Sequence, residues 1–222
     1  MRRAADDDLV ACPCGCGAEF VRMVADRERG LRDETLAAAP PGKLSGRDHA
    51  AAYLISGVPG AGKSTAARLL ALHFDRAAHI DIDLVFHHFT VTGREDPAAT
   101  TGEAARQADL AVVNAASMAR NYVAAGYVCV IEGAIATRRQ VRAGQDALAP
   151  YPLHLIVLAP PAAVSDQRDA DRSGKQVAGH FRHLGPLLGA ELAGLGLWID
   201  NSGQAPLDTV REILAHGASG RL

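Results

Sequence analysis

Short runs of consecutive apolar residues alternate along this chain with longer segments in which apolar residues recur every three or four positions. The apolar runs are rich in valine and isoleucine and are flanked by glycine, proline or aspartate; they lie at 53–56, 79–83, 127–131, 153–158 and 197–199. Continuous apolar runs of this length are typical of parallel strands that are buried on both faces. The pattern therefore predicts five buried strands.

The segments between these runs have the apolar spacing of helices. We expect helices at about 63–75, 98–125, 138–149, 161–173, 181–193 and 206–217. Pro206 near the start of the last segment and Gly217 at its end fit the usual punctuation of a helix. Strands that alternate with helices predict an α/β fold with a five-stranded parallel sheet sandwiched between helices.

Composition divides the chain into two regions. Residues 1–46 are rich in charge and end in a linker-like stretch with two prolines and two glycines, whereas the strand and helix pattern occupies 50–222. We therefore expect a short N-terminal extension followed by one domain, since 222 residues suit a single domain of ordinary size.

Charge and hydropathy exclude several classes of protein. The formal net charge of −2 and the aromatic content of 5% argue against a strongly cationic nucleic-acid binder and against a stacking platform for single strands. No run reaches the roughly 18 apolar residues that a membrane span requires. The N-terminus has two arginines and three aspartates without a long apolar run, so it does not resemble a secretory signal, and we expect a cytoplasmic protein.

The most specific motif follows the first apolar run and precedes a predicted helix. It fits G-x-x-x-x-G-K-[ST], the Walker A pattern, in which glycines let the backbone curl into a nest of N–H donors around phosphates. Lys63 is expected to reach the β- and γ-phosphates, and the Ser64 hydroxyl to bind Mg²⁺. The predicted ATP-binding residues are Gly57, Val58, Pro59, Gly60, Ala61, Gly62, Lys63, Ser64 and Thr65.

Acidic residues mark the ends of the second and third apolar runs. On an extended strand Asp81 and Asp83 would point to the same face, so that one could hold Mg²⁺ through water and the other could accept the proton of an attacking hydroxyl. Glu132 could orient water on Mg²⁺ or bind substrate hydroxyls. The alternative is that these acids cap helices or lie solvated at strand ends.

Arginines supply further candidates. Arg168 and Arg172 are four residues apart on one predicted helix face and could stabilise transferring phosphate, although Asp169 and Asp171 offer ordinary ion pairs instead. A nearby glycine, Gly174, could serve as the hinge of a lid. Arg94 is a candidate substrate anchor or a surface charge.

Three cysteines lie close together near the N-terminus, at Cys12, Cys14 and Cys16. They could form part of a zinc site, but a structural zinc ion needs four ligands and no second pair follows. A reduced cysteine-rich tail and a redox function are the alternatives. Cys129 lies inside a predicted strand and is expected to pack in the core.

Together these motifs resemble the small P-loop kinases, a set that includes the chloramphenicol phosphotransferase-like, zeta-toxin-like, shikimate-kinase-like and polynucleotide-kinase-like groups. The resemblance covers roughly residues 50–217 and rests on the Walker A segment, the two aspartates, Glu132 and the arginines. It implies ATP, Mg²⁺ and an acceptor hydroxyl. It also implies that Asp83 is the base and that Asp81 lies near the metal.

The sequence thus predicts an ATP- and Mg²⁺-dependent kinase that phosphorylates a hydroxyl of a small molecule, of the antibiotic, sugar or nucleotide-sugar class. Two alternatives remain open, a polynucleotide 5′-hydroxyl kinase and a non-catalytic nucleotide-binding regulatory module. No motif identifies the acceptor.

Overall fold

A computed structural model describes residues 43–99, 101–171 and 179–222. The cysteine cluster, Arg172 and Gly174 lie outside these described residues. The elements in chain order are β1 (Ala52–Gly57), α2 (Lys63–Leu72), β2 (Ala77–Asp81), α3 (Ile82–Phe89), α4 (Gly102–Ala124), β3 (Val128–Glu132), α5 (Arg138–Leu148), β4 (Leu153–Leu158), α6 (Ala162–Ala170), α7 (Leu184–Leu192), β5 (Leu197–Ile199), α8 (Pro206–His216) and the 3-10 helix η1 (Gly217–Gly220).

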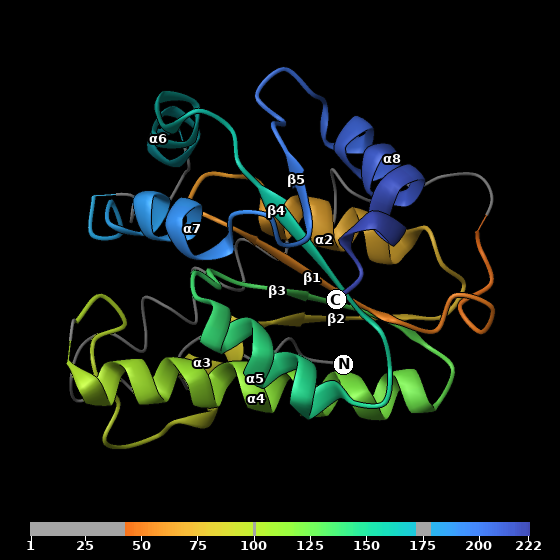
Figure 1. The fold of residues 1–222 in the computed structure, drawn as a ribbon, viewed down its shortest axis with the longest axis horizontal. Helices are drawn as coiled ribbons and strands as arrows, with labels where there is room; N and C mark the ends of the chain where they lie inside the picture. Colours follow the sequence, from red (N-terminus) through yellow and green to blue (C-terminus); the bar gives the residue numbers. More distant parts are fainter. Residues whose placement is uncertain (1–42, 100, 172–178) are drawn as a thin grey trace, which may run out of the picture.

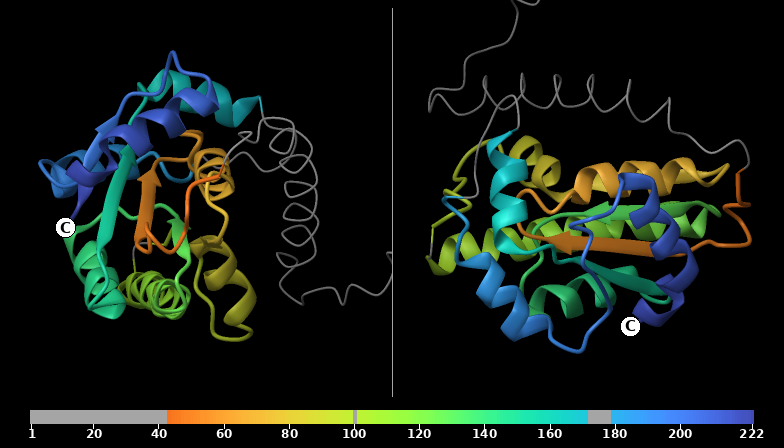
Figure 2. Two further views of the ribbon diagram at one scale, coloured as in Figure 1. Left: turned by 90° about the vertical axis from the view of Figure 1, so that its right-hand side faces the viewer. Right: turned by 90° about the horizontal axis from the view of Figure 1, so that it is seen from above.

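The five strands form one sheet in the order β2-β3-β1-β4-β5, and every neighbouring pair is parallel. Helices cover both faces of this sheet, with α3, α4 and α5 on one side and α2 and α8 on the other (Figure 1). The predicted α/β architecture and all five predicted strands are confirmed. Each crossover helix returns the chain to the same end of the sheet, so the carboxyl ends of the strands lie together (Figure 2).

Alternation along the strands explains why the apolar runs are continuous. In β4, Leu153, Leu155 and Val157 face the core beneath α4 and α5, whereas Ile156 and Leu158 face the core beneath α2 and α8. A strand that is buried on both faces needs apolar side chains at every position. Cys129 follows the same rule: it is fully buried in β3, and burial raises the pKa of its thiol to about 12, as expected for a packing residue.

The helix α3 was not predicted, and it corrects the expected geometry of the two aspartates. The second strand ends at Asp81 instead of continuing to residue 83, and the helix α3 begins at Ile82. The Asp81 side chain caps this helix by accepting a hydrogen bond of 2.9 Å from the backbone N–H of Asp83. The two carboxylates therefore do not share one face of an extended strand.

The described chain begins before β1 with a segment that packs on the domain. The Leu44 backbone N–H donates to the His73 carbonyl, and the Leu44 carbonyl accepts from the Asp75 N–H. The backbone N–H of Gly46 donates to the Asp75 carboxylate at 2.7 Å. Residues 44–46 thus bind the turn that leads into β2. Among the described helices, none is both long and apolar enough to cross a membrane.

Candidate active site

The loop between β1 and α2 has the backbone shape that phosphate binding requires. Gly60 and Gly62 adopt positive φ angles of 78° and 92°, and Gly62 forms the N-cap of α2. Such left-handed conformations favour glycine, which explains the glycine pattern of the motif. The Lys63 ammonium donates a hydrogen bond of 3.0 Å to the Val58 carbonyl, which folds the side chain back over the loop. The loop and helix N-terminus together form an anion-binding concavity.

Helix α6 packs directly against this loop. A Cβ at Gly60 would overlap the carbonyl oxygen of Ser165, so the two backbones approach more closely than any side chain permits. Ser165 is 2% exposed, which shows that this contact is fully buried. The sequence predicted that this helix carries Arg168 and Arg172. Its first part packs against the phosphate loop.

We expect Gly60→Ala to weaken ATP binding at least tenfold and to lower the melting temperature. The substitution combines an unfavourable positive φ, which costs an alanine about 1–2 kcal/mol, with a collision against Ser165. The matched control is Gly194→Ala, because Gly194 has a φ of 76° but open space around it. Nucleotide titration and thermal unfolding of both variants separate the two effects, and equal ATP affinities would refute the importance of the close approach.

Two carboxylates meet beside the loop at the carboxyl edge of the sheet. Asp81 and Glu132 are the last residues of adjacent strands and are register partners, and Glu132 also lies opposite Ile55 of β1, two residues before the loop begins. Glu132 is only 2% exposed, and its carboxylate lies 3.9 Å from the His79 imidazole. A buried acid at the end of a strand is costly unless it serves a charge or a hydrogen bond.

These groups fit a magnesium site that is completed by phosphate. Within the described residues, no three histidine, cysteine or acidic side chains gather closely enough to hold a metal by themselves. Mg²⁺, however, is usually held by one or two carboxylates together with phosphate oxygens and waters. The Ser64 hydroxyl and the carboxylates of Asp81 and Glu132 are oxygen donors of the kind that such a site would use.

Asp83 lies in the first turn of α3 with its side chain exposed. The adjoining residue Asp81 fixes this turn through the capping hydrogen bond. An acid in a first helical turn is favoured in its ionised form by the helix dipole. Asp83 therefore lies at the sheet edge as part of a helix, whereas the sequence predicted that it would lie on a strand.

Arg168 takes part in a chain of hydrogen bonds that ends at the phosphate loop. Its guanidinium donates to the carbonyls of Asn201 and Ser202 at 2.9 and 3.3 Å. The Asn201 side chain, which is 6% exposed, in turn donates to the carbonyl of Ala61 at 3.0 Å. The chain links α6, the loop after β5 and the phosphate loop. Sequence reasoning did not single out Asn201, whose only signal was its position just after the last predicted strand.

Arg94 packs against the end of α3. Its guanidinium donates to the carbonyls of His87 and Thr90 at 2.8 and 3.4 Å. A cation at these carbonyls favourably balances the negative end of the helix dipole. The structure thus shows Arg94 stabilising the loop after α3, while its expected function as a substrate anchor stays a prediction.

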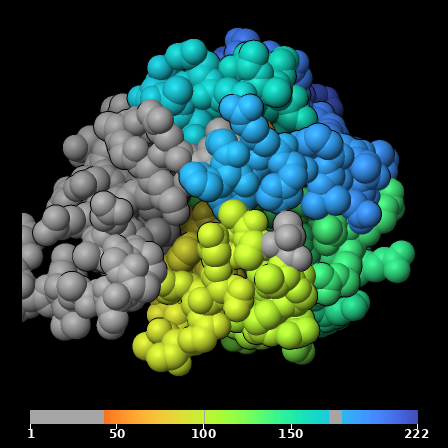
Figure 3. Space-filling view, turned by 90° about the vertical axis from the view of Figure 1, so that its left-hand side faces the viewer, coloured from red at the N-terminus to blue at the C-terminus, as the bar shows by residue number. Residues whose placement is uncertain are grey.

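The structure brings together Lys63, Ser64, Asp81 and Glu132 at one edge of the sheet. Figure 3 views this edge, with residues 90–107 in yellow-green lying below α6 and the segment that follows residue 179. A family model described as an AAA domain matches residues 53–183, more than half of the chain. The chain belongs to this AAA domain family.

The fold of this AAA domain is also that of small P-loop kinases. A sugar kinase from Janibacter sp. HTCC2649 is 20% identical with a TM-score of 0.59, and the match covers 74% of this chain and 92% of that one. A gluconokinase from Sinorhizobium meliloti 1021 is 17% identical with a TM-score of 0.59, over 76% and 92% of the two chains.

The tunicamycin resistance protein of Deinococcus radiodurans is 18% identical to this AAA domain with a TM-score of 0.57, over 75% and 94% of the two chains. A search of curated protein sequences returns no match. At these identities the likeness establishes the fold, and the suspected relationship to small P-loop kinases is confirmed at that level.

Proposed function

We propose that this protein is an ATP- and Mg²⁺-dependent kinase that transfers the γ-phosphoryl group to a hydroxyl of a small molecule. The observation that carries the proposal is that a phosphate loop lies beside Asp81 and Glu132, which end adjoining strands, and beside Asp83 in the first turn of α3. A nucleotide-binding module without catalysis would need the loop alone. The kinase fold of the similar structures supports the same reading.

In the proposed reaction, the backbone N–H groups of the loop and the α2 N-terminus hold the phosphates of ATP. Lys63 stabilises the charge that develops on the transferring group. The acceptor hydroxyl forms a bond to the γ-phosphorus while the bond to the β-phosphate oxygen breaks, and ADP leaves. Asp83 accepts the hydroxyl proton. The product is the phosphate ester of the acceptor.

Ser64, Asp81 and Glu132 would hold the magnesium ion of the nucleotide. Bound there, Mg²⁺ supplies positive charge that neutralises the β- and γ-phosphate oxygens. Asp81 also keeps its capping bond to α3, so the same carboxylate links the nucleotide site to the helix that presents Asp83. We infer that nucleotide binding and base positioning are coupled through this residue.

Arg168 acts in this proposal through the loop after β5. We expect Arg168→Ala to raise the KM for ATP about tenfold, because a hydrogen bond from a charged group contributes about 1.5–3 kcal/mol. Steady-state kinetics with varied ATP measures this change. A fall in kcat of more than a hundredfold at unchanged KM would instead assign Arg168 to the transferring phosphate, as the sequence suggested.

The test of the kinase proposal is mass spectrometry of the full chain incubated with Mg-ATP and a library of hydroxyl compounds and short oligonucleotides. A small molecule heavier by about 80 Da, the mass of a transferred phosphoryl group, supports the proposal. Phosphorylation of the oligonucleotides alone would favour the polynucleotide kinase. ATP binding without any product would favour the regulatory module.

A further inference from the structure

A pocket of about 270 Å³ lies between α3, the loop that follows it and the N-terminal half of α4. Its walls are mixed: Phe86 and Leu110 give apolar surface, while Thr90, Glu103, Gln107 and Asn114 give polar groups. Pockets for drug-sized ligands span about 300–1,000 Å³, so this one suits a compound of roughly monosaccharide size. A pocket that combines apolar surface with a few polar groups can bind both the carbon skeleton and the hydroxyls of a sugar-like molecule.

The pocket is next to the proposed base. Phe86 lines it and follows Asp83 in α3 by three residues, and Thr90, which also lines it, is the residue directly after α3. Residues three apart in a helix lie on one face, with Cβ atoms about 5–6 Å apart, so Phe86 connects the pocket to the face that carries Asp83. A molecule in the pocket can therefore extend a hydroxyl along α3 toward the Asp83 carboxylate.

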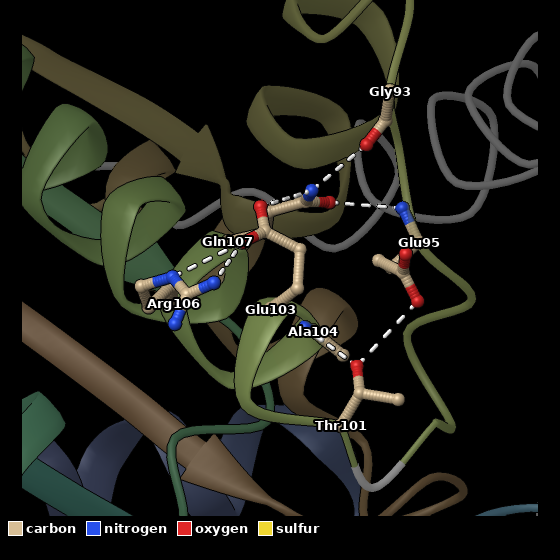
Figure 4. A network of polar contacts seen from close by, with 7 residues as sticks. All are labelled: Gly93, Glu95, Thr101, Glu103, Ala104, Arg106 and Gln107. Carbon is tan, nitrogen blue, oxygen red and sulfur yellow. Dashed lines mark hydrogen bonds and ion pairs between the residues drawn. The ribbon is translucent and has the colours of Figure 1, made fainter.

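One side chain holds the wall of the pocket in place. Gln107 donates hydrogen bonds to the carbonyl of Gly93 and to the Glu103 carboxylate, at 2.9 and 2.8 Å, and accepts one of 2.9 Å from the backbone N–H of Glu95. Figure 4 shows this network, in which the loop lies across the start of α4. Thr101 caps α4 by accepting from the N–H of Ala104. Side-chain hydrogen bonds therefore fix the position of the loop that forms this wall of the pocket.

The charge in the described lining of the pocket comes from one carboxylate. Among the described residues that line it, Glu103 is the sole charged side chain, and hydrogen bonds from Gln107 and Arg106 lower the pKa of its carboxyl, so that it stays ionised. Arg106 pairs with Glu103, but it is 71% exposed and does not line the pocket. Arg94 is directed at the carbonyls that end α3. An anionic ligand would therefore meet a carboxylate and no lining cation.

We propose that this pocket binds the phosphoryl acceptor and selects a neutral or cationic polyhydroxy compound over an anionic one. The inference rests on the proposed kinase function and names the substrate class of the same site. Like charges placed close together disfavour binding, so specificity against sugar acids is built into Glu103. The hydroxyl of Thr90 and the amide of Asn114 supply further polar contacts for the acceptor.

The experiment divides the hydroxyl library into three pools by charge at neutral pH. The neutral pool holds monosaccharides, polyols, nucleosides and phenicols, the cationic pool holds amino sugars and aminocyclitols, and the anionic pool holds gluconate, other sugar acids and sugar phosphates. Each pool is incubated with the full chain and Mg-ATP, and phosphorylated products are quantified by mass spectrometry. We expect at least tenfold more product from the neutral or cationic pool than from the anionic pool.

The origin of the selectivity is tested with a matched pair of variants. Glu103→Gln removes a first-turn acid that pairs with an arginine three residues later, and Asp208→Asn removes the same arrangement from α8, far from the pocket. We expect Glu103→Gln to lower kcat/KM for an amino-substituted acceptor about fivefold relative to its neutral analogue, since an exposed charge pair contributes only modestly in water. The KM for ATP and the kinetics of Asp208→Asn should not change.

The outcomes separate the two proposals. Product mainly from the anionic pool overturns the inference and leaves the kinase proposal standing. If the ratio of kcat/KM for the amino-substituted acceptor to that for the neutral acceptor is unchanged in Glu103→Gln, the function assigned to Glu103 is overturned. A merely structural effect of the substitution would lower kcat/KM for both acceptors alike and would also appear as a loss of stability in Asp208→Asn. The absence of product from every pool, with or without ADP formation, overturns the kinase proposal and the inference with it.

Discussion

Replacing Lys63 by alanine is expected to lower kcat for phosphoryl transfer by about 10²–10³-fold, the usual cost of removing one donor that stabilises developing charge. The ammonium is held over the phosphate loop by its bond to the Val58 carbonyl and has no other cation beside it within that loop. The loss should appear in kcat more than in the KM for ATP, because the backbone N–H groups of the loop remain. Steady-state kinetics with the acceptor found by mass spectrometry provides the measurement.

Two further variants make the result of Lys63→Ala interpretable. Lys43→Ala removes an exposed lysine before β1 and should leave kcat and stability unchanged. Lys63→Arg keeps the charge but alters its size and donor geometry, and should recover only part of the activity. Thermal unfolding of all three checks that the fold is intact. A loss smaller than fivefold in Lys63→Ala would contradict the proposed chemistry.

The second large effect is expected for Asp83→Asn. Asparagine keeps the shape of the side chain but cannot accept a proton at neutral pH, so kcat should fall by about 10²–10⁴-fold, the range for loss of a general base. ATP binding should change less than twofold, because Asp83 belongs to α3 and not to the phosphate loop. Single-turnover transfer and a separate ATP titration measure the two quantities.

Asp208→Asn is the control for this variant as well, since Asp208 is the first-turn acid of α8. Both changes remove one favourable interaction with a helix N-terminus, which contributes about 0.3–1 kcal/mol to the free energy of unfolding. Any similar loss of stability therefore cancels in the comparison. Turnover by Asp83→Asn within tenfold of the unmodified protein would exclude Asp83 as the base and direct attention to Asp81 or Glu132.

The hydrophobic pattern predicted the strands well because the three central strands β1, β3 and β4 are buried on both faces, while the edge strands β2 and β5 are partly buried. Leu153–Leu158 and Leu197–Ile199 have the predicted bounds, and the other three strands differ from the prediction by no more than two residues at either end. The glycine pattern likewise predicted the phosphate loop, since positive φ angles at Gly60 and Gly62 restrict those positions to glycine. These features depend on local chemistry.

The run after Asp81 shows where the pattern failed. Apart from Asp83, the residues from Ile82 to Phe86 are apolar enough to continue a strand, and the pattern predicted a strand as far as residue 83. The structure begins a helix there, because the Asp81 carboxylate accepts from the Asp83 N–H and because Val85 and Phe86 are then buried against the same core as α4. A short apolar segment is compatible with either structure until its neighbours are known.

The sequence by itself determined the elements whose reasons are local: five apolar strands, a glycine-rich phosphate loop, and acids at strand ends. Tertiary structure alone decided which distant residues meet. It placed Ser165 against Gly60 and Asn201 against Ala61, and it joined Gln107 to the loop after α3 beside a pocket. These contacts join segments that are far apart in the sequence and use backbone carbonyls and amides. Because such groups are present at every position, no sequence pattern indicates which of them come together.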